Sequence, residues 1–558
     1  MLSTNKFYLL SLTIYLLLVG CSKVKVVHYR QPSIIILDSV STPISGKVLK
    51  NWYQKDIIKD TIPGISLEKV YTELSFSDSK NIIIAVIDTE IDINHEDLKD
   101  QIWINNKEIP NNNIDDDSNG YIDDINGWNF IGGKNGNIIY SNYEVVRIIR
   151  EYQDKFEGKK ENEITSSDKE DFSLYQKAKN VYDEQLKLAK EDQEHGNFLF
   201  ENYPKSKALL KTFFPLENYN LSQVDSLYNV YEHDKELKKL IYFMSDFLEY
   251  ELSEEWINDY KKHADLKVSK TLNLDFNDRE ILGDNPKDLN DENYGNGNVS
   301  GNLDEFYHGT VVAGVIGATR NNNIGIDGIS NNLKIMSLNI SSNGEEHDKD
   351  ISLAIKYAVD NGAKIINMSL AKNFSLHQEW VQEAIHYASE KDVLIIHAAS
   401  NENTDIDKTL VYPNDIDSKG NEFVDNFITV GSISNKLSKD FRSYFSNYGK
   451  TNVDIFAPGD EIFTTEIKNS YGFHSGTSMA TAIVTGISSL LRSNYPDLSA
   501  SQIKEILMKS GTLYNFNVEI NQKDESKKII PFSELSKSGS VVNAYNALLM
   551  AEQVSDNN

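Results

Sequence analysis

The sequence is poor in cysteine and in basic residues. The first shortage excludes a fold held by internal disulfide bonds, and the second argues against a nucleic-acid-binding protein. Cys21 is the single cysteine, so no disulfide bond can form within the chain. Lysine and arginine number 56 against 84 aspartates and glutamates, and the formal net charge of −28 argues against a nucleic-acid partner. Apolar residues make up 40% of the 558 residues, which is enough for a sizeable core.

The chain also offers no comfortable membrane span near its start. The apolar run at residues 7–18 is too short for one, follows Lys6, and leads through Leu18 to Gly20 and Cys21. This pattern resembles a bacterial lipobox, and the other interpretation is a secretory signal with an incidental cysteine. We expect a lipoprotein signal peptide at residues 1–20, lipidation of Cys21 and a tether at residues 21–50. Residues 22–25 carry no acidic export tract, which favours an outer-membrane protein that faces the periplasm over a surface protein.

Strand-like and helix-like patterns alternate through most of the chain. The continuous apolar run at residues 81–88 is typical of a strand buried on both faces of a parallel sheet. Helical patterns alternate with further strand-like runs at residues 333–338, 364–370, 393–401, 427–432 and 453–459. This rhythm predicts an α/β fold, a three-layer sandwich with a mostly parallel central sheet.

Residues 140–270 differ in character from the rest. Glycine and proline are sparse there, and apolar residues recur at helical spacing, as in Leu237, Leu240, Ile241 and Met244. We predict a helical insertion at residues 140–270, whose apolar stripes we interpret as internal packing in preference to a partner groove.

Four polar positions fall where strands end or helices begin. Asp88 ends the first buried strand, Asn401 ends a later one, and His308 opens an apolar helix rich in small residues. Ser478 lies near the start of another helix, beside the free backbone N–H groups of its first turn. Each residue alone has a plainer interpretation, as a turn, a structural histidine or a helix cap. We expect Thr477 to be the cap and Ser478 to be free for chemistry.

These positions lie in four segments that together resemble the signature segments of the subtilisin-like serine proteases, in that family's chain order. The segments are residues 87–89, 308–314, 398–401 and 476–480. The resemblance implies a serine endopeptidase in which Ser478 is the nucleophile, His308 the general base and Asp88 the residue that orients it. It also implies an oxyanion hole built from the Asn401 side chain and the Ser478 backbone N–H.

The resemblance covers a peptidase domain at residues 51–139 and 271–555. It implies protein or peptide substrates, a monomer and no organic cofactor. It places substrate binding at Ser369, Leu370, Ala371, Ala399 and Ser400. Ala371 and Ser400 replace glycines that are usual in the family, so we expect small or medium side chains at P1, the substrate residue before the scissile bond. Glu90, Val311 and Ala482 also depart from the pattern but remove no catalytic atom.

An acidic loop suggests a cation. Oxygen-bearing side chains alternate at Asp115, Asp117 and Asn119, as in the first half of an EF-hand loop. No glutamate stands at the twelfth position, which excludes an EF-hand proper, and a plain acidic surface loop is the other interpretation. We predict a structural Ca²⁺ site with Asp115, Asp117, Asn119, Tyr121 and Asp124 as ligands, in a segment similar to one in bacterial subtilisin-like proteases.

A second function stays open at this stage. The chain could be a binding or assembly lipoprotein built on a catalytically silent protease scaffold, with the insertion as its working surface. Retention of Asp88, His308, Asn401 and Ser478 argues against this alternative.

Overall fold

The computed structural model describes residues 44, 46–76, 79–134, 136–231, 233–522 and 526–556, and the backbone of residues 34–35. The predicted signal peptide, Cys21 and most of the predicted tether lie outside the described residues. In the described part of the chain, no helix combines the length and apolar character that a membrane crossing requires.

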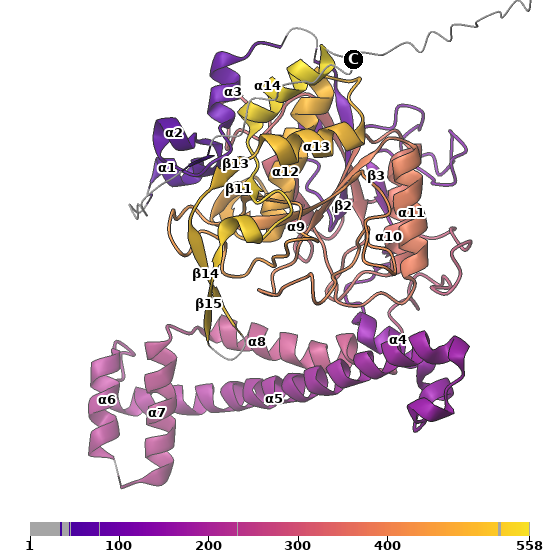
Figure 1. Ribbon diagram of the computed structural model, residues 1–558. Helices are drawn as coiled ribbons and strands as arrows, with labels where there is room; N and C mark the ends of the chain where they lie inside the picture. Colours follow the sequence, from indigo (N-terminus) through magenta and orange to yellow (C-terminus); the bar gives the residue numbers. More distant parts are fainter. Residues whose placement is uncertain are drawn as a thin grey trace, which may run out of the picture.

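A twisted sheet forms the middle of the molecule (Figure 1). Its strands pair in parallel, except that β13 and β16 are antiparallel. In spatial order within the described residues, the ten strands are β1 (Ile34–Ile35), β13 (Thr512–Tyr514), β16 (Ser540–Val541), β10 (Ile455–Pro458), β9 (Phe427–Ile433), β8 (Leu394–Ala398), β7 (Ile365–Met368), β2 (Ile82–Asp88), β6 (Leu333–Asn339) and β3 (Gly127–Asn129).

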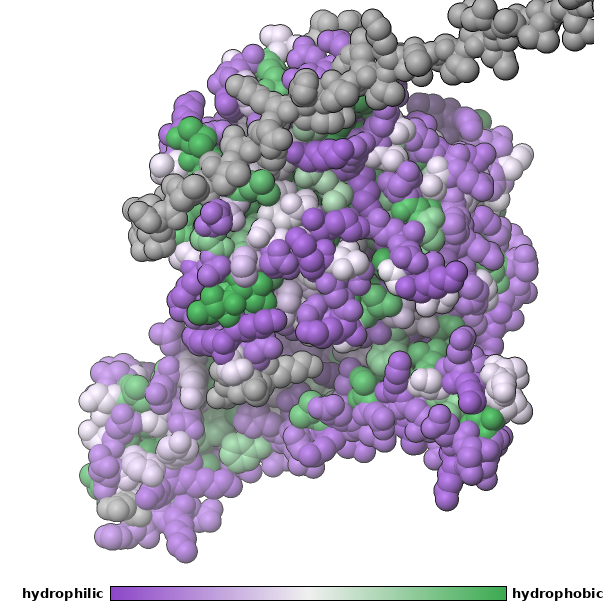
Figure 2. All heavy atoms as spheres, viewed as in Figure 1, coloured by the Kyte–Doolittle hydropathy of each residue, from purple (hydrophilic) through white to green (hydrophobic). Residues whose placement is uncertain are grey.

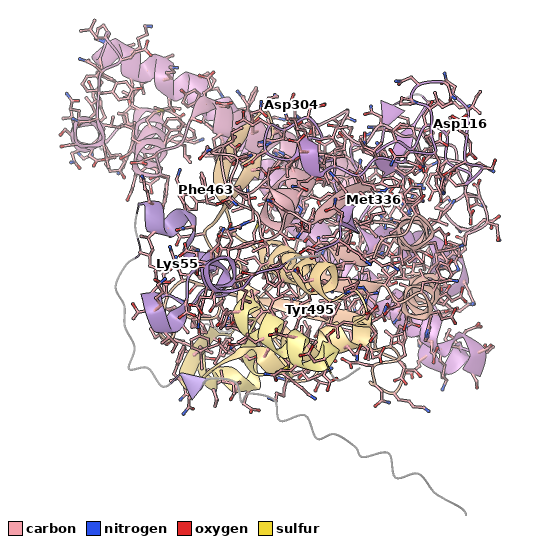
Figure 3. The ribbon with its side chains drawn as sticks, turned by 90° about the horizontal axis from the view of Figure 1, so that it is seen from above. Lys55, Asp116, Asp304, Met336, Phe463 and Tyr495 are labelled. Carbon is pink, nitrogen blue, oxygen red and sulfur yellow. The ribbon has the colours of Figure 1, made fainter. Side chains whose placement is uncertain are left out.

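Helices cover both faces of this sheet because its central strands are apolar on both sides. In β2, Ile84 and Val86 enter one core while Ala85 and Ile87 enter the other. The first face carries α3 (Leu67–Glu73), α9 (His308–Gly317), α12 (Thr477–Asn494), α13 (Ala500–Ser510) and α14 (Ala544–Ser555), and the second carries α10 (Asp348–Asp360) and α11 (Gln378–Glu390). This confirms the predicted three-layer α/β fold. Met336, on β6, lies in the interior of the second core (Figure 3).

Smaller elements lie around the sandwich. Three antiparallel hairpins flank it among the described residues: β11 (Ile462–Glu466) with β12 (Ser470–His474), β14 (Asn517–Asn521) with β15 (Lys527–Pro531), and the short β4 (Gly132–Gly133) with β5 (Gly136–Asn137). The remaining short elements are α1 (Lys47–Lys50), η1 (Trp52–Gln54), α2 (Ile57–Asp60), η2 (Lys99–Gln101), η3 (Glu161–Glu163), η4 (Ser166–Asp168) and η6 (Phe532–Glu534). The final helix begins only at Ala544 because Ser540 and Val541 pair with neighbouring strands.

Between β5 and β6 the chain leaves the sandwich as a group of helices that extends along one side of it (Figure 1). The helices are α4 (Glu144–Phe156), α5 (Lys169–Phe213), α6 (Leu221–Val230), α7 (Lys235–Glu249), α8 (Glu254–Leu266) and the π-helical turn η5 (Lys267–Thr271). A proximal core joins α4 to the near half of α5, and a distal core joins the far half of α5 to α6, α7 and α8. The group closes on itself where the Tyr143 N–H donates to the Thr271 carbonyl at 2.9 Å. On the face in view its surface is mostly hydrophilic (Figure 2).

Candidate active site

Asp88 and His308 meet at the carboxyl edge of the sheet. Asp88 is the last residue of β2 and is buried, and His308 is the first residue of α9. His308 Nδ1 lies 2.7 Å from Asp88 Oδ1, which also accepts the Thr89 N–H at 2.7 Å. The second carboxylate oxygen, Oδ2, is buried without a hydrogen-bond partner among the described residues. His308 is therefore the one side chain that hydrogen-bonds with the Asp88 carboxylate among the described residues.

A glycine allows this close approach. A Cβ on Gly309 would lie 2.4 Å from the Thr89 carbonyl oxygen, nearer than a side-chain carbon can come. The Gly309 N–H instead donates to Thr89 Oγ1 at 2.8 Å and fixes the start of α9 against the end of β2. The sequence His308-Gly309 is thus required by packing as well as by chemistry.

The charges around His308 favour its protonated form. Burial lowers the pKa of His308, but the charge and hydrogen bond of Asp88, together with the charge of Glu346, outweigh burial and raise the pKa above its ordinary value. The ring remains 38% exposed, so solvent and a substrate can reach it. This arrangement suits a base that must hold a proton during the reaction.

Ser478 lies in the first turn of α12, close to Asn401. The expectation that Thr477 caps this helix is wrong. Thr477 is the first helical residue, Gly476 precedes it in extended conformation, and Asn401 Oδ1 accepts both the Thr477 N–H at 2.9 Å and the Thr477 hydroxyl at 3.0 Å. The helix is therefore capped by Asn401, from the loop after β8. Because Asn401 Oδ1 is bound to Thr477, Asn401 Nδ2 points away from Thr477.

The Asn401 amide group and the Ser478 backbone face a common space. A Cβ on Gly476 would lie 3.6 Å from Asn401 Nδ2, 3.7 Å from Ser478 N and 3.9 Å from Ser478 Oγ. Two N–H donors and a hydroxyl thus surround the same small volume at the positive end of a helix dipole. This geometry can stabilise a negative oxygen that forms beside the hydroxyl.

The hydroxyl of Ser478 is hydrogen-bonded to a backbone carbonyl. Ser478 Oγ donates to the Ser369 carbonyl at 3.2 Å, and Ser369 Oγ donates to the Ser478 carbonyl at 3.2 Å. Among the described residues no hydrogen bond joins Ser478 to His308. The Ser478 hydroxyl must leave the Ser369 carbonyl before it can give its proton to His308.

The predicted substrate-binding residues are only partly brought together. Ser369 and Leu370 follow β7 beside Ser478 and are 8% exposed, while Ala371 is half-buried. Ala399 is fully buried, so its side chain cannot line a pocket. Ser400 is half-buried and adopts a φ of +77°, in the left-handed region that favours glycine.

The acidic loop gathers a different set of groups from the one predicted. Oxygens of Asp115 and Asp117 lie within 4.8 Å of one another and of an oxygen of Glu108, which sequence reasoning missed because Glu108 precedes the alternating pattern. Asp124 is not part of this group, since its buried carboxylate accepts hydrogen bonds from Asn105, Asn119 and the Tyr357 hydroxyl. Asn119 is thereby directed at Asp124, and the Tyr121 ring packs edge-on against Trp128 and Tyr357. Asp116 belongs to the same loop and lies near the edge of the molecule (Figure 3).

The chain is similar to known proteins over much of its length. A model of the subtilase family matches residues 79–529. The chain is 29% identical over 276 residues to Subtilisin-like protease 1 of Plasmodium falciparum (isolate 3D7), which covers 45% of this chain and 38% of that protein. It is 28% identical over 373 residues to the cell wall-associated protease of Bacillus subtilis (strain 168), with coverage of 63% and 38%. It is 33% identical over 232 residues to the thermophilic serine proteinase of Bacillus sp. (strain AK1), with coverage of 41% and 49%.

The matched regions make up less than half of the length of each of these three curated relatives. Among solved structures, a cold adapted subtilisin-like serine proteinase matches with 26% identity and a TM-score of 0.31, covering 42% of this chain and 72% of that one. The prenylagaramide maturation protease PagA matches with 25% identity and a TM-score of 0.35, with coverage of 43% and 82%.

Proposed function

The chain belongs to the subtilase family, and from that premise we propose that it is a serine endopeptidase that cleaves protein or peptide substrates as a monomer. The observation that carries the proposal is the 2.7 Å contact between His308 Nδ1 and the buried Asp88 carboxylate, at the same sheet edge as Ser478 and Asn401. Acid, base, nucleophile and amide donor are the groups that acyl transfer to a serine requires.

In the proposed reaction Ser478 Oγ attacks the scissile carbonyl carbon. His308 Nε2 takes the hydroxyl proton and later gives it to the leaving amine, while Asp88 holds Nδ1–H and stabilises the imidazolium. The carbonyl oxygen becomes negative and receives hydrogen bonds from Asn401 Nδ2 and the Ser478 N–H. Substrate binding is expected to release the Ser478 hydroxyl from the Ser369 carbonyl and to turn it toward His308. Water then repeats the sequence on the acyl-enzyme and regenerates Ser478.

The proposal includes a narrow specificity. The side chains of Ala371 and Ser400 add atoms where a substrate strand would lie beside Ser478, so small or medium P1 side chains are favoured. Efficient cleavage after phenylalanine or tyrosine in a peptide library would contradict this.

We also propose a lipid anchor on Cys21 that holds the enzyme at the periplasmic side of a bacterial outer membrane. Metabolic labelling with an alkyne fatty acid should mark the wild-type protein and fail on Cys21→Ala.

A structural Ca²⁺ completes the proposal. Glu108, Asp115 and Asp117 supply the hard oxygen ligands that Ca²⁺ prefers, and their charges need compensation where they converge. A bound cation there would hold the loop of residues 105–124 in place and would take no part in proton transfer.

A fluorophosphonate probe tests the central proposal, because it reacts only with an activated serine. Wild-type protein should be labelled and Ser478→Ala should not. Ser475→Ala is the matched control, since Ser475 lies in the same turn but hydrogen-bonds with Asp460 and Glu461 and should leave labelling unchanged. A folded wild-type protein that neither reacts with the probe nor cleaves peptides would refute the proposal and favour the silent binding lipoprotein.

A further inference from the structure

One backbone carbonyl near the active site receives hydrogen bonds both from the helical insertion and from the catalytic body. The Glu346 carbonyl oxygen accepts a hydrogen bond from Arg147 Nη1 at 2.9 Å and another from Lys372 Nζ at 2.9 Å. Arg147 belongs to α4, the first helix of the insertion, and its Nη2 group also donates to the Glu345 carbonyl. Lys372 lies three residues after Ser369, the residue whose carbonyl holds the Ser478 hydroxyl. A single carbonyl thus links the insertion to two segments of the body.

Buried acids hold these two cations in place. Glu144 pairs with Arg147 and lies 3.2 Å from Lys372 Nζ, and Asp348 lies 2.8 Å from the same Nζ. All four side chains are at most 7% exposed. We call the cluster of Glu144, Arg147, Asp348 and Lys372 the brace. Removing one partner of a buried ion pair leaves an uncompensated charge and is strongly destabilising. We therefore expect the four side chains of the brace to hold α4 firmly against the catalytic body.

The segment that leads into the insertion also contacts the loop of residues 341–346, which contains Glu345 and Glu346. The Asn343 N–H donates to the Ile139 carbonyl at 3.0 Å, and the Ser141 N–H donates to the Asn343 carbonyl at 3.1 Å. A Cβ on Gly344 would lie 2.2 Å from the Ser141 carbonyl oxygen, so backbone packs directly on backbone. The loop of residues 341–346 is therefore held from the insertion side along most of its length.

The two segments that the brace joins lie on either side of the reacting groups. The loop of residues 341–346 follows β6, and the Ser341 N–H donates to the Asp88 carbonyl. Residues 369–372 follow β7 and reach Ser478. In the sheet, β2 with Asp88 lies between β6 and β7, so these two segments flank Asp88 at the edge where Ser478 lies.

We propose that Arg147 is a positioning residue that sets the separation of the loop of residues 341–346 from the segment of residues 369–372, and hence the fit of an extended substrate. The proposal rests on the serine endopeptidase function. It gives the insertion a role in substrate binding, since its first helix supports the loop of residues 341–346. Small reagents that touch only Ser478 and the oxyanion donors do not need this support.

Arg147→Lys is the sharpest variant because it keeps the charge beside Glu144 and removes the planar fork that reaches two carbonyls at once. Lys372→Arg disturbs the same Glu346 carbonyl from the opposite side and serves as a second variant. Arg150→Lys is the matched control, one turn along α4, because Arg150 hydrogen-bonds with Asn142 and the Phe276 carbonyl and, within the described residues, forms no hydrogen bond or ion pair with residues 341–346.

The full chain is assayed in two ways, by the rate of fluorophosphonate labelling and by kcat and KM for an octapeptide, with thermal unfolding as a check on folding. For Arg147→Lys we expect kcat/KM for the octapeptide to fall about tenfold to a hundredfold, mainly through KM, as for a small misplacement of substrate-positioning groups. The labelling rate should stay within about twofold of wild type, and Lys372→Arg should give the same pattern.

Each other outcome counts against the proposal. An equal loss of labelling and peptide cleavage would show that Arg147 only maintains the fold around Ser478. Unchanged octapeptide kinetics in both variants, or an equal effect of Arg150→Lys, would also overturn it. A wild-type protein that neither labels nor cleaves would refute the proposed function itself, which is a distinguishable failure.

Discussion

Replacing Asn401 should separate catalysis from helix capping, because the two ends of its amide serve different purposes. Oδ1 accepts the N–H and the hydroxyl of Thr477, and Nδ2 faces the space beside Ser478. Asn401→Ala removes both functions. Asn401→Asp keeps an acceptor for Thr477 and replaces the N–H donor by a second oxygen.

The magnitudes follow from these contacts. Loss of two hydrogen bonds at a helix start should cost Asn401→Ala about 1–2 kcal/mol of stability. Asn401→Asp should be as stable as wild type or more stable by about 0.3–1 kcal/mol, because an anion is favoured at a helix N-terminus. Loss of an oxyanion donor slows subtilisin, a member of this family, by about 10²–10³ in kcat, and we expect a loss on the same scale in both variants.

The assay combines kcat for a chromogenic peptide with the midpoint of thermal unfolding. Thr477→Val is the control, since it removes one hydrogen bond from Asn401 Oδ1 and leaves Nδ2 intact, so it should lose stability but retain activity. An Asn401→Asp enzyme with near wild-type kcat would refute the role of Nδ2. An Asn401→Ala protein that unfolds at the wild-type temperature would refute the role of Oδ1.

Three further predictions concern pH, strain and metal. The pKa of His308 is raised mainly by Asp88, and His308 must be neutral to act as a base, so kcat/KM should rise with pH through a midpoint above 6.5. A pH–rate profile of Asp88→Asn should show that midpoint at lower pH and a greatly reduced kcat. Ser400→Gly removes a side chain from a left-handed conformation and should stabilise the fold by about 0.5 kcal/mol while widening P1 tolerance in a peptide library; a lower unfolding temperature would contradict this. Removing Ca²⁺ with EDTA should lower the unfolding midpoint by an amount equivalent to about 3 kcal/mol for a site that is a hundredfold saturated, and Asp117→Asn should abolish that response while Asp124→Asn should keep it.

The sequence was most informative where chemistry and local structure coincide. Asp88, His308, Asn401 and Ser478 each stand at the end of a strand or the start of a helix, so periodicity alone places them at one edge of a parallel sheet. The four lie together there because parallel strands all point their carboxyl ends to the same side.

The contacts that sequence reasoning missed depend on distant backbone atoms. Nothing near Thr477 reveals that its N–H is capped from Asn401, because the acceptor lies 76 residues away. Lys372 reads as an ordinary surface lysine, yet it is buried against Glu144 and the Glu346 carbonyl. Glu108 joins Asp115 and Asp117 only through a turn of the loop. Each of these requires the three-dimensional path of the chain, which periodicity does not encode.

The hydrogen bond between Tyr143 and Thr271, which joins the two ends of the insertion, also affects how the chain folds. Strands β2 and β6 are neighbours in the sheet, but the whole helical group lies between them in sequence. Helices form through local contacts, so we expect the group to fold early and to join Tyr143 to Thr271 before β6 reaches β2. That closure removes about half of the loose chain between the two strands, and each halving of a loop lowers the entropy cost of closing it by only about 0.6 kcal/mol. The central sheet can therefore accommodate so long an interruption with little penalty, and further lengthening of the distal helices would add almost none.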